Sequence, residues 1–145
     1  ESLEYNVEEI KNRETELKET KEFASSLFYK FPNPASLSTP EGVRIDANEA
    51  LLDLYGKGNK EEWIGTKLEA IYAKEDIPTL KKMLENTRKT GYDLCELTAI
   101  RGDGTRFPAI LNFSTLKDSK GNVTHLIGTC TDANELKNKE KSKSQ

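Results

Sequence analysis

Residues 92–131 alternate between apolar and polar side chains with a period of two. Three runs carry this alternation, at 92–100, 107–116 and 123–131, and the glycine-containing segments RGDGTR and KDSKGN separate them. A period of two places successive side chains on opposite faces of a strand, and short glycine turns join antiparallel neighbours. This part of the chain is therefore predicted to form a three-stranded antiparallel meander.

Two short strands and two helices are predicted before the meander. The segments ASLS and GVRID flank the turn sequence TPEG, and the tetrapeptide DANE at 46–49 follows. There Asp46 is expected to accept from the first free N–H groups of a helix while Glu49 reaches back, with Asn48 as the alternative cap. A second helix is expected to run from about residue 76 to Gly91. The order of these elements indicates an α+β domain.

The first 30 residues form a separate segment, rich in Glu and Lys, that lacks Gly and Pro from residue 3 to 28. Its apolar residues recur at helical spacings, and Glu14 and Lys21 interrupt the stripe that they form. A stripe this thin cannot hold a helix in water by itself, so the helix is expected to pack on the domain or on a second copy of itself. The apolar positions are Leu3, Val7, Ile10, Leu17, Ala24 and Phe28.

The charge composition limits the partners. The 22 basic and 25 acidic residues give a net charge of −3, so there is no electrostatic reason to expect nucleic acid as a partner. No apolar run approaches the roughly 20 residues that span a bilayer, and we expect no direct membrane contact. The two cysteines, Cys95 and Cys130, are too few for a zinc site or a disulfide scaffold, and they suit a reducing, cytoplasmic compartment.

Catalytic motifs are not found. The single histidine, His125, lies within a predicted strand without a neighbouring nucleophile or carboxylate, and there is no glycine-rich phosphate loop and no metal-ligand spacing. The chain is therefore predicted to be non-catalytic, and any enzymatic activity is expected to belong to a parent protein.

Several motifs occur together in a particular order: NEALLDLYG after two strands, then WIGTKLEAI, KEDI, RGDGTRFPA and finally GNVTHLIGTCTDANE. In this order and spacing the chain resembles a PAS domain, the small sensor module of bacterial and archaeal signalling proteins. The resemblance covers about residues 31–135. It implies a flanking helix at 1–30, a PAS domain at 31–133 with a five-stranded antiparallel sheet in the order 2-1-5-4-3 and short helices over one face, and the start of an exit helix or linker at 134–145.

The resemblance also implies a pocket between sheet and helices. In the family, the residue two positions before the Asp that ends the last strand faces inward. This places Cys130 inside, and alternation then assigns its neighbours. Such a lining is a packed core that can also admit a small, largely apolar ligand, with Thr124 or a tyrosine hydroxyl as its polar anchor. The candidate pocket residues are Leu54, Tyr55, Tyr72, Met83, Cys95, Leu97, Leu111, Phe113, Thr124, Leu126 and Cys130.

At the end of the last predicted strand, Asp132 and Glu135 occupy the positions that the family uses for signal relay to the exit helix. The outer face of the sheet is expected to need a cover, for which the helix at 3–28 is the candidate. That helix and the outer face are expected to form a homodimer contact. The candidate interface residues are Leu3, Val7, Ile10, Leu17, Phe28, Ile110, His125 and Ile127.

By resemblance, the chain is expected to be a sensory or regulatory module of a multidomain signalling protein of the sensor histidine kinase, two-component type. A ligand-free dimerisation or protein-interaction module and a haem-binding sensor are the alternatives. Flavin photochemistry is not expected, because GKGNKEEWIG lacks the cysteine of the flavin-binding branch. Residues 77–90 lack the histidine that holds haem, which leaves only the thiolates of Cys95 or Cys130 as iron ligands. The expected ligand is thus an unidentified small molecule or none.

Overall fold

The computed structural model describes residues 2–56 and 58–136, with side chains from residue 6 onward. Three short 3-10 helices, η1 to η3, lie between the second and third α-helices. The elements in chain order are α1 Ser2–Lys30, β1 Ala35–Ser38, β2 Arg44–Ala47, α2 Glu49–Tyr55, η1 Lys60–Glu62, η2 Leu68–Ile71, η3 Lys74–Asp76, α3 Ile77–Thr90, β3 Tyr92–Ile100, β4 Arg106–Lys117 and β5 Val123–Asp132.

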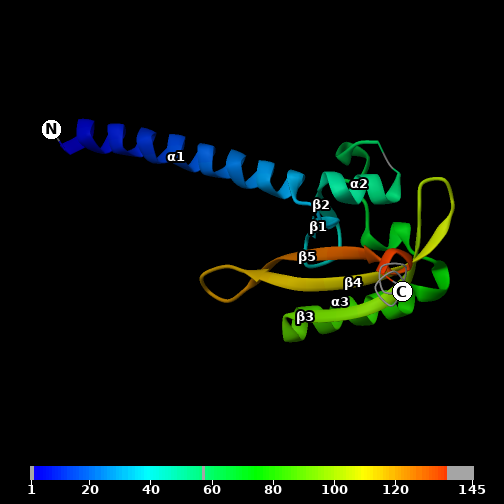
Figure 1. The fold of residues 1–145 in the computed structure, drawn as a ribbon. Coiled ribbons are helices and arrows are strands. Elements are labelled where there is room, and N and C mark those ends of the chain that lie inside the picture. Colours follow the sequence, from blue (N-terminus) through cyan, green and yellow to red (C-terminus); the bar gives the residue numbers. More distant parts are fainter. Residues whose placement is uncertain (1, 57, 137–145) are drawn as a thin grey trace.

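The strands form one antiparallel sheet in the order β2-β1-β5-β4-β3 (Figure 1). The meander supplies β3, β4 and β5, and the N-terminal hairpin joins it because β1 pairs with β5, with Ser36 opposite Gly128. This arrangement confirms the predicted fold class and strand order. It also places β5 at the centre of the sheet, where it contacts strands from both halves of the domain.

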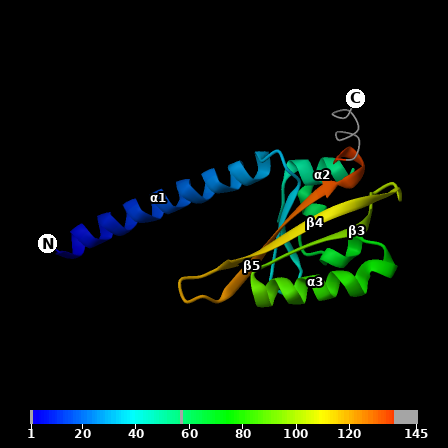
Figure 2. The ribbon, with the colours of Figure 1, turned by 60° about the horizontal axis from the view of Figure 1, so that its bottom comes forward.

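One face of the sheet carries the hydrophobic core. Inward side chains such as Leu97, Leu111 and Leu126 form a single cluster with side chains from α2, η2 and α3. In Figure 2, α2 lies over the β1 side of the sheet and α3 runs along the β3 side. Each fully buried leucine contributes about 2 kcal/mol to the free energy of unfolding, so this cluster is the main source of stability.

Asn48 caps α2, so the prediction that Asp46 caps it is wrong. The fully buried Asn48 side chain accepts hydrogen bonds from Leu51 N at 3.0 Å and Ala35 N at 2.9 Å, and it donates to Asn33 O at 2.7 Å. An aspartate has no N–H to donate, so it cannot replace the asparagine here. Asp46 instead accepts from the neighbouring backbone N–H of residue 47. Glu49 does not reach back, because its carboxylate pairs with residue 30.

Helix α1 extends away from the domain, towards the same side as the turn between β4 and β5 (Figures 1 and 2). The side chains of residues 6–27 are almost all exposed, including Leu17 and Phe23. Contact with the domain is made at the C-terminal end of α1, where Tyr29 packs on the core and Lys30 pairs with Glu49 at 3.1 Å. The expectation that this helix covers the outer face of its own sheet is therefore wrong for the single chain. The few apolar residues of α1 would bury too little surface to hold the helix against the sheet.

Candidate functional site

The interior brings together the predicted pocket residues, with the exception of Thr124. Leu54 and Cys95 are half-buried at the edge of the core, and the remaining residues are buried. Cys130, Phe113 and Leu126 are all buried in the same core, as the alternation from Cys130 requires. The buried members of the set are Tyr55, Tyr72, Met83, Leu97, Leu111, Phe113, Leu126 and Cys130.

Thr124 does not line the interior, because the strand pairing shifts at this point. Leu116 pairs with His125 and Lys117 pairs with Val123, which leaves Thr124 as the extra residue of a β-bulge. The Thr124 hydroxyl donates to Leu116 O at 3.2 Å, and Val123 packs against the core instead. The polar anchor that the alternation assigned to this position is thus absent from the pocket.

The interior holds a cavity of about 10 Å³, which is close to the least space that one water molecule needs. The ring of Phe113 fills the space over Gly128, where an added Cβ atom would lie 2.5 Å from Phe113 Cε1. A ligand larger than a water molecule or a monatomic ion therefore requires a lining side chain to move. The lining residues are Ser36, Arg44, Leu51, Ile71, Tyr72, Leu111, Phe113, Gly128, Thr129 and Cys130.

Tyr55 connects α2 to β5 inside the core. Its ring packs edge-on against Trp63 and Phe107, with ring centroids 5.2 and 5.4 Å away, and its hydroxyl lies 3.7 Å from Cys130 Sγ. Burial raises the pKa of Tyr55 and of Tyr72 above the usual range, and it raises the pKa of Cys130 to about 11. These groups are therefore neutral at pH 7, and they supply O–H and S–H donors without negative charge.

Strand β2 sends the side chain of Arg44 into the interior, where only 2% of the residue surface is exposed. Its Nη1 donates to Lys67 O at 2.8 Å and to Thr66 Oγ1 at 3.2 Å, and its Nη2 donates to Leu68 O at 3.3 Å. The guanidinium group lies 4.9 Å from the centroid of the Trp63 ring. Burial lowers the pKa of Arg44 from its ordinary value. The side chain joins β2 to the segment that precedes η2.

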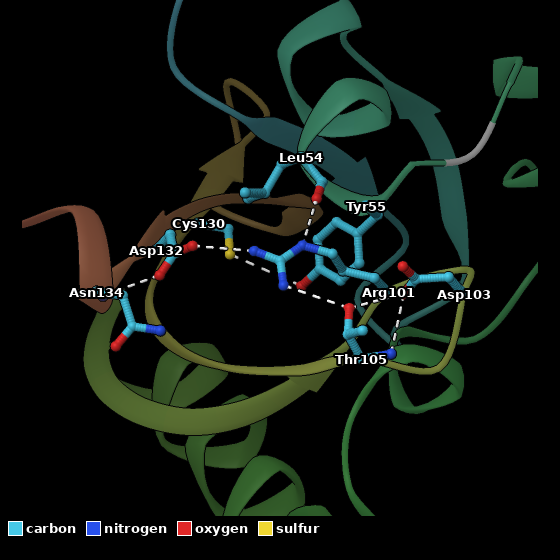
Figure 3. Close-up of polar contacts among 8 residues, drawn as sticks. All are labelled: Leu54, Tyr55, Arg101, Asp103, Thr105, Cys130, Asp132 and Asn134. Carbon is cyan, nitrogen blue, oxygen red and sulfur yellow. Dashed lines mark hydrogen bonds and ion pairs between the residues drawn. The ribbon is translucent and has the colours of Figure 1, made fainter.

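A second arginine lies where β3 and β5 end (Figure 3). Arg101 Nη2 pairs with Asp132 Oδ2 at 3.0 Å, and Arg101 Nε donates to Leu54 O at 3.3 Å. The other carboxylate oxygen of Asp132 accepts from Asn134 N at 2.8 Å, at the start of the helical residues 133–136. Figure 3 shows the guanidinium group between the C-terminal end of α2 and the end of β5, close to Tyr55. The network joins α2, the β3–β4 turn and the exit from β5.

Sequence reasoning did not select Arg44 or Arg101. Arg101 was visible as the first residue of the turn segment RGDGTR, but nothing in the sequence identified its carboxylate partner. In GVRID, hydropathy favours a buried Ile45 and an exposed Arg44, whereas the structure buries Arg44 and leaves Ile45 37% exposed. The loop segment at 65–68 causes this reversal, because residues 65 and 66 bond to the backbone of Arg44 and residues 66–68 accept from its guanidinium group.

The remaining candidate residues lie outside the core. Ile110, His125 and Ile127 are half-buried, and the Nδ1 atom of His125 lies 2.9 Å from the Thr124 hydroxyl. Glu135 is exposed, and the α1 positions Val7, Ile10 and Leu17 are exposed while Phe28 is half-buried. The side chain of Leu3 and residues 137–145 of the expected exit helix lie outside the described residues.

Neither metal clusters nor membrane spans occur in the part of the chain that the structure describes. Residues 2–56 and 58–136 contain no group of three or more His, Cys, Asp or Glu side chains placed to hold a metal ion. Over the same residues, no helix is both long enough and apolar enough to cross a membrane.

Comparison with protein families gives a match between residues 32–135 and the family described as "PAS domain". Comparison with curated proteins gives no match. Among solved structures, the PAS domain of a protein from Colwellia psychrerythraea superposes with a TM-score of 0.70 at 17% identity, over 78% of this chain and 96% of that chain. The PAS domain of an HTR-like protein from Haloarcula marismortui gives 0.68 at 17% identity, over 84% of this chain and 98% of that chain.

A third solved structure is a PAS domain in complex with ethanol, from a transcriptional regulator of the LuxR family in Burkholderia thailandensis. It superposes with a TM-score of 0.62 at 18% identity, over 74% of this chain and 95% of that chain. At these identities the structural matches establish the fold.

Proposed function

Because the chain belongs to the PAS domain family, we propose that it is the sensory module of a multidomain signalling protein, with a histidine kinase as the effector class, and that β5 relays a change in its interior to the segment after Asp132. One observation carries this proposal. Cys130 and Asp132 lie two residues apart on β5, and the first contacts the interior while the second holds the exit.

The contacts around α2 support a mechanical link between these two positions. The Tyr55 hydroxyl contacts Cys130, and the Tyr55 carbonyl accepts from Gly102 N at 2.9 Å. The adjacent carbonyl of Leu54 accepts from Arg101, the partner of Asp132. A displacement of Tyr55 would thus act on both sides of the Arg101–Asp132 ion pair. The hydrogen bond from the Asn134 N–H to Asp132 would then be the first contact after β5 to change.

The size of the interior supports a small ligand. A space of about 10 Å³ admits little without movement of the Phe113 ring, so binding and rearrangement of the core would occur together. The ethanol complex of the LuxR-family PAS domain is a precedent for a very small molecule in this fold.

The relay is tested by replacing Asp132 with Ala in the full-length parent protein. We expect signalling output to change while the emission of Trp63 and the far-UV circular dichroism stay those of the wild type, because Asp132 lies at the exit and not in the cavity. Asp53→Ala, an exposed aspartate of α2, is the matched control. Unchanged output in a stably folded Asp132→Ala protein would contradict the proposal.

A second candidate function is homodimerisation through α1. In this helix, Ile10 is 52% exposed and Leu17 is 70% exposed. The two residues lie seven positions apart, which is the spacing of a coiled-coil seam. We expect the chain to sediment as a dimer and the double variant Ile10→Glu, Leu17→Glu to sediment as a monomer. Thr15→Glu, on the same helix but off this seam, is expected to remain dimeric. A wild-type chain that stays monomeric at all concentrations would exclude this function.

A further inference from the structure

Arg44 carries a positive charge that no described carboxylate compensates. Its acceptors are the carbonyl groups of Lys67 and Leu68 and the hydroxyl of Thr66, which are all neutral. The ion pairs of the described residues do not include Arg44. A charge removed from water is unfavourable unless opposite charge or a full set of hydrogen bonds replaces the water. The interior around Arg44 therefore favours a negative charge.

The hydrogen bonds of Arg44 are also incomplete. Its Nε atom is buried and has no acceptor among residues 2–56 and 58–136, although a guanidinium group donates through every N–H that it carries. A buried donor without an acceptor lowers stability. One anion placed beside Nε would supply both the missing acceptor and the missing charge.

Arg44 also borders the internal cavity, together with Ser36, Tyr72 and Cys130. The side chains of these three residues end in O–H or S–H groups. Burial raises the pKa of Tyr72 and of Cys130, so both keep their protons at neutral pH. The cavity is thus bounded by a cation and by neutral donors, a set that suits an anion and disfavours a cation. Its volume of about 10 Å³ suits a monatomic species.

We propose that this cavity binds a small monovalent anion, of the size of a halide ion, against the guanidinium group of Arg44. This inference rests on the proposed function and deepens it, because it names the class of small molecule that the interior takes. Gly128 and Cys130 line the same cavity from β5, so occupancy acts on the strand that ends at Asp132.

The competing explanation is purely structural: Arg44 would hold the segment at 66–68 against β2, and the cavity would take a water molecule in place of an anion. The two explanations differ in the response to salt that they predict. A structural arginine with a bound water responds to ionic strength alone. An anion site distinguishes a small anion from a bulky one at the same ionic strength.

The fluorescence of Trp63 reports on the site directly. Trp63 is the single tryptophan of the chain, and its ring lies 4.9 Å from the Arg44 guanidinium group. The full chain is titrated with sodium bromide against sodium gluconate at constant ionic strength, with acrylamide as a neutral quencher. We expect a saturating response to bromide, none to gluconate, and weak linear quenching by acrylamide because Trp63 is buried. A bromide response that is absent or strictly linear would overturn the proposal.

Variants locate the anion. Arg44→Gln is expected to raise the bromide concentration at half-saturation by about ten- to a hundredfold, since a charge-assisted hydrogen bond is lost. Arg88→Gln is the matched control, because Arg88 is exposed and donates to the backbone carbonyl of Pro40. A folded Arg44→Gln protein that keeps the full saturating response would overturn the assignment to Arg44.

Anomalous diffraction from bromide-soaked crystals of the wild type keeps the test decisive if Arg44→Gln does not fold. A bromide peak beside Arg44 Nε supports the site, and a water molecule there in its place overturns it. Hydrogen exchange of the β5 amides separates this inference from the relay. Bromide binding without a change in β5 exchange would refute the sensory role but keep the site. If bromide does not bind but Asp132→Ala still alters signalling output, the anion site is refuted and the relay is retained.

Discussion

The two arginines that reach into this domain have similar surroundings and one decisive difference. Arg44 lies over the Trp63 ring and donates to backbone carbonyls, while Arg101 lies 4.2 Å from the centroid of the Phe107 ring and also donates to a carbonyl. Of these two arginines, Arg101 alone has a carboxylate partner among the described residues, the 6% exposed side chain of Asp132.

The difference separates two uses of an arginine that packs against the core. A compensated arginine such as Arg101 joins elements, and its charge is already paired with a carboxylate. The uncompensated Arg44 joins elements as well, but its charge remains available to a ligand. Cys130 lies between the two sites, since it lines the cavity beside Arg44 and precedes Asp132 by two residues.

The largest effect is expected from Arg44→Met. The variant removes the three hydrogen bonds of the guanidinium group, to Thr66 Oγ1, Lys67 O and Leu68 O, although Lys67 O keeps the Ala70 N–H as a donor, so we expect the free energy of unfolding to fall by about 4 kcal/mol. Urea denaturation measures it, with Arg88→Met as a control that changes stability by less than about 0.5 kcal/mol. An Arg44→Met protein as stable as the control would show that the buried arginine contributes little.

Alkaline pH gives the next largest effect, through the cysteine between the two sites. Burial raises the pKa of Cys130 from 9.0 to about 11, so the folded state retains a thiol proton that the unfolded state has lost between these values. Stability that is present below pH 9 is then lost as the pH rises through about 11, by roughly 3 kcal/mol for this group. Denaturation at several pH values should give a smaller alkaline loss in Cys130→Ala. An identical loss in both proteins would contradict the assignment.

Gly128→Ala acts directly on the Arg44 side of the comparison. The added Cβ atom would lie 2.5 Å from Phe113 Cε1, so the ring must move within the core, which destabilises the fold by about 2 kcal/mol. We expect this variant to change the bromide response as well, because both residues line the cavity. Calorimetry and Trp63 fluorescence measure the two effects. A normal bromide response would show that the cavity and the Phe113 ring are independent.

Asp132→Asn alters the Arg101 side of the comparison and has the smallest expected effect on stability. The amide oxygen can still accept from Asn134 N, and the Arg101 side chain is 30% exposed, so water can partly replace the lost charge. We expect a loss of about 1 kcal/mol in urea denaturation, with the bromide response unchanged. A loss as large as that of Arg44→Met would mean that charge compensation does not separate the two arginines.

Local patterns in the sequence predicted the strands and helices, whereas the order of the strands in the sheet came from the family resemblance. The alternation over 92–131 predicted three strands, because strand periodicity is a local property. The family resemblance supplied the inward anchor, and together with alternation it placed Phe113, Leu126 and Cys130 in one core. It failed at Thr124, where the pairing between β4 and β5 inserts a bulge that no local pattern marks. The start of α2 was misassigned for a similar reason. The backbone carbonyl of Asn33 accepts from the side-chain amide of Asn48, a bond that an aspartate cannot donate, and this long-range contact favours the asparagine over Asp46.

Only part of the candidate site was predicted from the sequence. The family resemblance and strand alternation identified the apolar lining but not Arg44, because the burial of Arg44 depends on a loop that bonds to an edge strand. The helical character of α1 was predicted, but not its direction, since a thin apolar stripe does not specify what it packs against. Asp132 was found through the family resemblance, whereas Arg101 became its partner only when β3 and β5 were brought together at their ends.

The claim that β5 couples the interior to the exit is tested most directly by hydrogen exchange of the Asn134 amide in Gly128→Ala. Asp132 Oδ1 holds that amide at 2.8 Å, and position 128 lies inside the core away from it. Gly58→Ala, at an open surface position, is the matched control. We predict faster exchange at Asn134 in Gly128→Ala and wild-type exchange in Gly58→Ala. Exchange at Asn134 that is unchanged in Gly128→Ala, while amides around residue 128 respond, would contradict the coupling.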